Sequence, residues 1–87
     1  MSNHAAKVKE FAADPLIREL EKVCEELCTE HVISSDTNLF EVGISSLTLA
    51  EIVMAIDEKY PGKLDISDLF DYPTLGMIAG LIRSRAD

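Results

Sequence analysis

The chain has 87 residues, 47% of them apolar and 6% aromatic, and a net charge of −8 with neutral histidines. These values predict one small domain with a mainly aliphatic core. So acidic a surface repels nucleic-acid backbones and favours partners that present positive patches. A chain this small leaves little room for a deep substrate cleft of its own, which argues against an enzyme.

Two cysteines, Cys24 and Cys28, lie four residues apart in a helical pattern, so they are expected in or beside the core as free thiols. Their spacing fits neither a C-x-x-C redox motif nor a zinc site. The first residues lack the apolar core of a secretory signal, and no run approaches the roughly 20 apolar residues of a membrane span. We therefore expect a monomeric, cytoplasmic protein with reduced thiols, without bound metal and without a membrane or nucleic-acid partner.

Residues 1–13 have helix propensity but only a weak apolar pattern, and we expect an N-terminal arm or a short extra helix there. Asp14 and Pro15 form a helix start, because Asp can cap a helix and Pro suits its first position. Apolar residues then recur at helical spacing, which predicts a first helix from Pro15 to His31. These residues are Leu16, Leu20, Val23, Cys24, Leu27 and Cys28.

A long connection follows over residues 32–42, rich in Ser, Asp, Thr and Asn. Leu39 and Phe40 depart from this polar composition, and we expect both to insert into the bundle and fix the loop. The second helix is predicted from about Ser45 to Tyr60, where a Pro-Gly pair ends it.

The last part of the chain predicts a short turn or helix over Ile66–Phe70 and a final helix capped by Thr74 that ends near Ser84. No segment alternates like a strand. The expected fold class is therefore all-α, a small four-helix bundle with three main helices, one short helix and a long loop between the first two main helices. Residues 14–84 would form this domain.

Ser46 lies in Gly43-Ile44-Ser45-Ser46-Leu47, where a turn-prone stretch passes into the second predicted helix. The first N–H groups of a helix have no partner inside it, and such ends attract phosphate. Gly43 lets the backbone turn tightly and keeps the approach open. Ser46 is therefore well placed to carry a phosphate-linked group. On spacing alone, an equally good interpretation is that Ser45 or Ser46 only caps the helix.

The second predicted helix has a core-facing side and an outward side, because an α-helix turns by about 100° per residue. The outward side presents two large apolar residues and two carboxylates next to Ser46. We call these four residues the outer strip: Leu47, Glu51, Met54 and Glu58. An exposed Leu and Met in line, framed by acids, favour a docking surface for partner proteins. Plain solvated surface is the alternative.

The run from Asp36 to Leu47, Asp-Thr-Asn-Leu-Phe-Glu-Val-Gly-Ile-Ser-Ser-Leu, resembles the prosthetic-group site of acyl and peptidyl carrier proteins. The later Leu69-Phe-Asp-Tyr-Pro-Thr74 resembles a segment of carriers from polyketide and nonribosomal peptide assembly lines. The resemblance as a whole covers about Asp14 to Ile82. In the family, the serine that matches Ser46 receives 4′-phosphopantetheine from coenzyme A. The supporting motif positions are Asp36, Phe40, Gly43 and Leu47.

The resemblance implies a carrier that holds acyl, aminoacyl or peptidyl cargo as a thioester and shuttles it between enzymes of polyketide or nonribosomal peptide biosynthesis. Its partners would be a phosphopantetheinyl transferase and enzymes of adenylation, acyltransferase, ketosynthase or condensation type with basic docking patches. No catalytic residue is assigned, because His4 and His31 lie outside the motif and no G-x-S-x-G elbow is complete. We expect a free-standing carrier, with an excised domain as the alternative.

Two other functions stay open. The stretch from Glu51 to Glu58 resembles fatty-acid carriers, which is an alternative inside the carrier class. The alternative from another class is a small acidic interaction module in which Ser46 only caps its helix. Ser45 also departs from the family, which usually has Asp or His before the modified serine. This departure leaves the transferase class and the subfamily open, and the residues do not identify the cargo.

Overall fold

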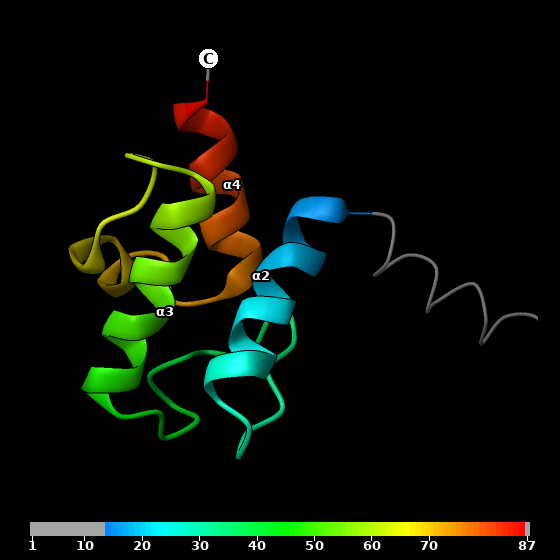
Figure 1. Ribbon diagram of the computed structural model, residues 1–87, viewed down its shortest axis with the longest axis vertical. Coiled ribbons are helices and arrows are strands. Elements are labelled where there is room, and N and C mark those ends of the chain that lie inside the picture. The colour runs from blue at the N-terminus through cyan, green and yellow to red at the C-terminus, as the bar shows by residue number, and fades with distance from the viewer. Residues whose placement is uncertain (1–13, 87) are drawn as a thin grey trace, which may run out of the picture.

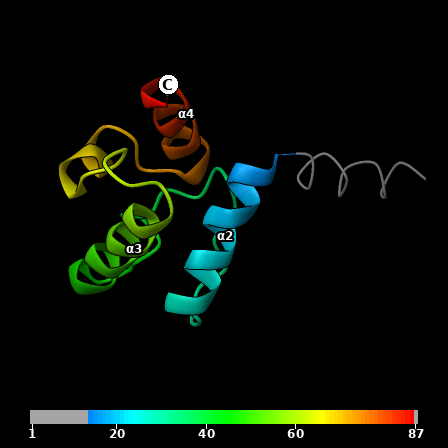
Figure 2. The ribbon, with the colours of Figure 1, turned by 45° about the horizontal axis from the view of Figure 1, so that its top comes forward.

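A computed structural model describes residues 14–86 and contains three α-helices and one 3-10 helix. They are α2 (Pro15–Leu27), α3 (Ser46–Lys59), η1 (Ile66–Phe70) and α4 (Leu75–Arg85). The described residues form no strand, and the all-α bundle with a long first loop is confirmed (Figure 1). The expectation for residues 1–13 lies outside the described residues. Figure 2 shows η1 on the side between α3 and α4, away from α2.

Two helix starts follow the local chemistry that the sequence predicts. The Asp14 carboxylate accepts hydrogen bonds from the N–H groups of Leu16 at 3.1 Å and Ile17 at 3.3 Å, and Pro15 takes the first helical position. The Thr74 hydroxyl accepts a hydrogen bond from the Met77 N–H at 3.2 Å. Each side chain satisfies donors that the helix itself cannot.

The predicted end of the first helix at His31 is wrong, because α2 ends at Leu27. Cys28 is its C-cap, with φ −133° and ψ 67°, and donates its N–H to the Cys24 carbonyl at 2.8 Å. Cys28 is nevertheless buried, like Cys24. The apolar spacing therefore continues for one residue beyond the last helical turn, which made the pattern look like a longer helix.

The core is aliphatic, as the composition predicts, and α2 packs against both α3 and α4. Its largest fully buried side chains are Leu20, Leu39, Ile52, Ile56, Leu69, Leu75, Ile78 and Cys24. Burial, followed by the neighbouring Cys28 and carboxylates, raises the pKa of the Cys24 thiol to about 12. This thiol therefore stays protonated and acts as a small apolar side chain.

The long loop is fixed by the buried side chains of Ile33 and Leu39 and by backbone hydrogen bonds to the start of α4. Leu39 is fully buried, and its N–H donates to the Pro73 carbonyl at 2.9 Å. The Gly76 N–H donates to the Ser35 carbonyl at 2.8 Å. The expectation that Phe40 also inserts into the bundle is wrong. Phe40 is 42% exposed, because its ring stacks on Phe70 at a centroid distance of 5.4 Å instead of entering the core.

Ion pairs join segments that are far apart in sequence. Arg83 of α4 binds both carboxylate oxygens of Asp14, and Arg85 binds Asp68 of η1 at 2.8 and 3.3 Å. Lys59 at the end of α3 pairs with Glu19 of α2 at 3.4 Å. Within residues 14–86, none of the helices has both the length and the apolar character needed to cross a bilayer.

Candidate functional site

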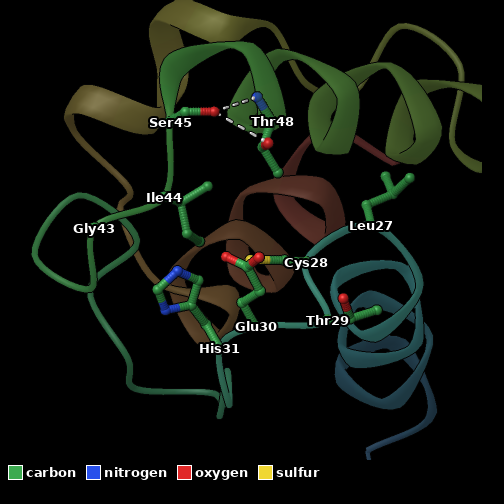
Figure 3. Close-up of a pocket in the computed structure, with 9 residues that line it drawn as sticks. All are labelled: Leu27, Cys28, Thr29, Glu30, His31, Gly43, Ile44, Ser45 and Thr48. Carbon is green, nitrogen blue, oxygen red and sulfur yellow. Dashed lines mark hydrogen bonds between the residues drawn. The ribbon is translucent and has the colours of Figure 1, made fainter.

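Two adjacent serines have different roles at the start of α3. Ser45 is the N-cap: its hydroxyl accepts a hydrogen bond from the Thr48 N–H at 3.2 Å and donates one to the Thr48 hydroxyl at 3.1 Å (Figure 3). Ser46 is the first residue of the helix and is exposed. Its hydroxyl makes no hydrogen bond to any residue that the structure describes. The cap and the free hydroxyl therefore belong to different residues.

Gly43 shapes the approach to this hydroxyl. Its φ of +94° is a backbone conformation that glycine adopts without strain and that other residues rarely adopt. A Cβ at this position would meet no atom within 4 Å, so conformation rather than crowding favours glycine here. Directly after this turn, the buried side chain of Ile44 anchors the chain before α3 begins. The turn therefore directs the serine pair outward.

The first turn of α3 suits a phosphate. The Ser45 hydroxyl caps the Thr48 N–H, and the Leu49 N–H donates to the Ser45 carbonyl at 3.0 Å. The N–H groups of Ser46 and Leu47 have no acceptor within the helix, and the partial positive charge of a helix start favours an anion there. The exposed Ser46 hydroxyl, which makes no hydrogen bond to the described residues, lies beside these donors and is a suitable attachment point for a phosphodiester. Ser46, rather than Ser45, has that combination.

A small apolar cavity of about 160 Å³ opens beside Ser46. Phe40 and Phe70, the stacked pair, line it together with Ile66 and the buried side chain of Leu69. The Leu69-Phe70 motif signals this segment in the sequence, although nothing there marks Phe70 or Ile66 as neighbours of the serine. The cavity brings one predicted motif position, Phe40, to Ser46. Asp36 is exposed in the loop and accepts a hydrogen bond from the Ser34 hydroxyl at 2.9 Å, outside this cavity.

All four residues of the outer strip are exposed, as the helical spacing predicts. Leu47 is 70% exposed and Met54 is 66% exposed, which is high for large apolar side chains. Glu51 and Glu58 place two carboxylates on the same side of α3. The helix therefore presents an apolar and acidic face that begins next to Ser46.

A polar hollow of about 320 Å³ lies on the other side of the serine pair, where the end of α2 faces the start of α3. Figure 3 shows the side chains of Glu30 and His31 in this hollow, close to Ile44. The hydroxyls of Ser45 and Thr48 at its edge bind each other. Within residues 14–86, no group of three His, Cys, Asp or Glu side chains could hold a metal ion.

Comparisons with known proteins agree with this geometry. Residues 18–82 match the family model described as "Phosphopantetheine attachment site". A "Hybrid PKS-NRPS synthetase mycA" from Thermothelomyces thermophilus is 29% identical over 62 residues, which cover 71% of this chain and 2% of that synthetase. The chain therefore corresponds to a very small part of this curated relative. No solved structure matches the chain significantly.

The family match covers most of the described residues and includes Ser45, all of α3 and η1, and most of α4. Proteins of this family carry a covalently attached 4′-phosphopantetheine group and act as carriers rather than as catalysts. An exposed hydroxyl at a helix start, beside a small apolar cavity in a helical bundle, suits that role. The chain belongs to the phosphopantetheine attachment site family of carrier proteins.

Proposed function

We propose that Ser46 is the attachment site of 4′-phosphopantetheine, and that residues 14–84 form the carrier domain. The observation that carries this assignment is the division between the two serines. The Ser45 hydroxyl is bound to the N–H and the hydroxyl of Thr48. The Ser46 hydroxyl is exposed and makes no hydrogen bond to the described residues. Its oxygen can form a bond to phosphorus without breaking the cap of α3.

The attachment is a phosphoryl transfer in which Ser46 supplies the nucleophile. A bond forms between the Ser46 oxygen and the phosphorus of the pantetheine arm, the pyrophosphate bond of coenzyme A breaks, and 3′,5′-ADP leaves. A base of the transferase takes the hydroxyl proton, because the described residues place no imidazole or amine against Ser46. Once attached, the group supplies a terminal thiol that holds cargo as a thioester.

The outer strip supports a shuttle that meets several enzymes in turn. Its exposed Leu47 and Met54 offer apolar contacts, and methionine adapts to different partner surfaces. Glu51 and Glu58 favour partners with basic patches. Electrostatic steering speeds encounters without requiring tight binding, so a partner can be released quickly. We assign this face to docking of the transferase and of the biosynthetic enzymes.

We further infer that the pathway is polyketide or nonribosomal peptide biosynthesis, with acyl, aminoacyl or peptidyl cargo. The Leu69-Phe70 and Pro73-Thr74 pairs resemble assembly-line carriers, and the curated relative is named a hybrid PKS-NRPS synthetase. The two buried free thiols fit a reducing compartment, so we place the carrier in the cytoplasm. A panel of adenylation enzymes and acyltransferases tests the pathway. Loading by fatty-acid enzymes alone would favour a fatty-acid carrier instead.

Intact mass after incubation with a broad-specificity phosphopantetheinyl transferase and coenzyme A tests the carrier role. The expected result is a gain of one phosphopantetheinyl group per chain, followed by reaction of one new accessible thiol with a maleimide. Cys24 and Cys28 are buried and therefore react slowly in the untreated chain, which is the control. A chain that gains no mass, while remaining folded by circular dichroism, is an interaction module rather than a carrier.

A further inference from the structure

The polar hollow between the end of α2 and the start of α3 is the larger of the two spaces that flank the serine pair (Figure 3). Its volume of about 320 Å³ reaches the lower end of the roughly 300–1,000 Å³ that small-molecule sites occupy. The apolar cavity at Ser46, with about 160 Å³, falls below that range. The hollow is therefore large enough for a small ligand, and its lining indicates which kind.

Three polar groups that line the hollow have unused hydrogen-bonding capacity. Among the described residues, neither the Glu30 carboxylate nor the His31 imidazole has a hydrogen-bond or ion-pair partner. Figure 3 shows both side chains in the hollow beside Ile44. The Thr48 hydroxyl accepts a hydrogen bond from the Ser45 hydroxyl at 3.1 Å, and its own hydrogen has no acceptor among the described residues. The hollow therefore offers one acceptor, one donor and one ring that can do both.

This set of groups favours a neutral amide over an ion. A carboxylate accepts hydrogen bonds but cannot donate them, so Glu30 disfavours an anion such as inorganic phosphate. A cation would pair with Glu30 but would leave the Thr48 hydrogen without an acceptor. An amide supplies an N–H for Glu30 and a carbonyl for His31 or Thr48. The hollow is therefore matched to a flexible polar chain that contains amides.

The hollow begins one residue from the proposed attachment point. Ser45 lies at its edge and is directly followed by Ser46. Gly43 also lines the hollow, and a Cβ at Gly43 would meet no atom within 4 Å, so the approach on that side is open. A group tethered to Ser46 is present beside the hollow at a high effective concentration, so that even a weak site is filled for much of the time.

Resting on the proposed function, we infer that this hollow holds the 4′-phosphopantetheine arm of the same chain while no partner enzyme has engaged the arm. Glu30 accepts a hydrogen bond from an amide N–H of the arm, and His31 and Thr48 donate to an amide carbonyl. The phosphate stays at the N–H groups of the first turn of α3. Because no residue of the outer strip lines the hollow, this resting site leaves the docking face accessible.

The apolar cavity on the other side of Ser46 suits the arm less well. Apart from Ser46, every side chain that lines this cavity is apolar. An amide placed there would lose its hydrogen bonds with water and gain no side-chain partner in return, which is unfavourable. The chemistry of the two linings therefore selects the hollow for the amide-containing part of the arm.

Nuclear Overhauser effects in the holo carrier, with an isotope-labelled arm on unlabelled protein, test this inference directly. The amide and methyl protons of the arm should show contacts to the His31 ring and to the methyl groups of Ile44, since both side chains line the hollow. Contacts to the rings of Phe40 and Phe70 instead, or no contact with the protein, would overturn the resting site.

Amide chemical-shift differences between the apo and holo forms measure how much of the arm occupies the hollow. Glu30→Ala and His31→Ala should each reduce the difference at Thr29, on the α2 side of the hollow, about threefold, because each removes a hydrogen bond to the arm. His31→Gln keeps a donor and an acceptor and should retain the difference. Glu26→Ala, on an exposed residue of α2, is the control. Circular dichroism melts verify folding, and Glu30→Ala decides the outcome if His31→Ala unfolds.

The possible outcomes separate the two proposals. A wild-type chain that gains no phosphopantetheine removes the proposed function. A chain that is modified on Ser46, but whose arm shows no contact with His31 or Ile44, overturns the resting site and leaves the attachment intact. Equal apo–holo differences in Glu30→Ala and in Glu26→Ala would likewise overturn the resting site alone.

Discussion

The end of the bundle that contains the last turn of α4 is joined by ion pairs, whereas the described residues at the Ser46 end form none (Figure 1). Asp14, Glu19 and Asp68 pair with cations of α3 and α4, so they are neutralised inside the molecule. At the other end, apolar burial and backbone hydrogen bonds hold the loop. The comparison indicates that the end with Ser46 does not depend on ion pairs between described residues, because apolar burial and backbone hydrogen bonds stabilise it.

The largest expected effect comes from the apolar anchor of the Ser46 end. Leu39→Ala should lower the free energy of unfolding by about 2–5 kcal/mol, because it leaves a cavity at a fully buried position. Phe40→Ala is the matched neighbour and should cost about 1 kcal/mol, the scale of an aromatic pair. Urea unfolding followed by circular dichroism measures both. Equal losses would mean that the loop is not held by Leu39.

The second effect concerns binding rather than stability. Met54→Glu should reduce thioester delivery to a partner enzyme about tenfold, because one apolar contact of the docking face is lost. The fold should be unaffected, since Met54 is exposed. Met77→Glu makes the same change on α4 and should leave delivery unchanged. Delivery assays with thioester-loaded carrier measure this effect. Unchanged turnover of Met54→Glu with every partner would contradict the assignment of the outer strip to docking.

Features that depend on contacts between residues close together in the sequence could be predicted, and features that depend on distant residues could not. Asp14 and Thr74 could be recognised as caps because each bonds to residues two or three positions ahead. The buried and exposed faces of α3 follow from helical spacing alone. The place of Ser46 at the start of α3 could be predicted for the same reason, since Gly43 lies only three residues before it. Its choice over Ser45 as the attachment site rests on the family resemblance and stays a prediction.

Features that depend on distant segments could not be predicted. Phe40 is exposed because its partner is Phe70, thirty residues later, and no local pattern indicates that stacking. The pairs of Arg83 with Asp14 and of Arg85 with Asp68 join α4 to segments 69 and 17 residues away. The early end of α2 was missed for a different reason, because Cys28 remains buried after the helix stops and so extends the apolar spacing. The small cavity beside Ser46 is likewise visible only once the fold is assembled, because the loop, α3 and η1 all line it.

Acid should weaken the ion-paired end selectively. Arg83 holds the pKa of Asp14 below its ordinary value of 3.8, and Arg85 does the same for the pKa of Asp68. A lowered folded-state pKa adds stability above the unfolded value, and this stability is lost as pH falls below about 3.8 through the folded pKa. Asp14→Asn should cost about 1 kcal/mol or less at neutral pH. The free energy of unfolding, measured with urea from pH 5 to pH 2, should also fall less steeply in this variant than in the wild type. Glu26→Gln, an exposed change on the same helix, is the control.

The smallest effect is expected at the most solvated of these pairs. Lys59 and Glu19 have side chains that are 47% and 40% exposed, so water screens their attraction. Lys59→Ala should change the free energy of unfolding by about 0.5 kcal/mol or less. A loss above that of Asp14→Asn in the same urea assay would reverse the ranking of the ion pairs.

The matched variants Ser45→Ala and Ser46→Ala test the central claim most directly. Each is incubated with the broad-specificity transferase and coenzyme A, and the modified residue is located by tandem mass spectrometry. Ser45→Ala should lose about 1 kcal/mol of stability with its cap and still gain one phosphopantetheinyl group. Ser46→Ala should remain folded and gain none. Modification of Ser46→Ala, or a group located on Ser45 in the wild type, would contradict the account.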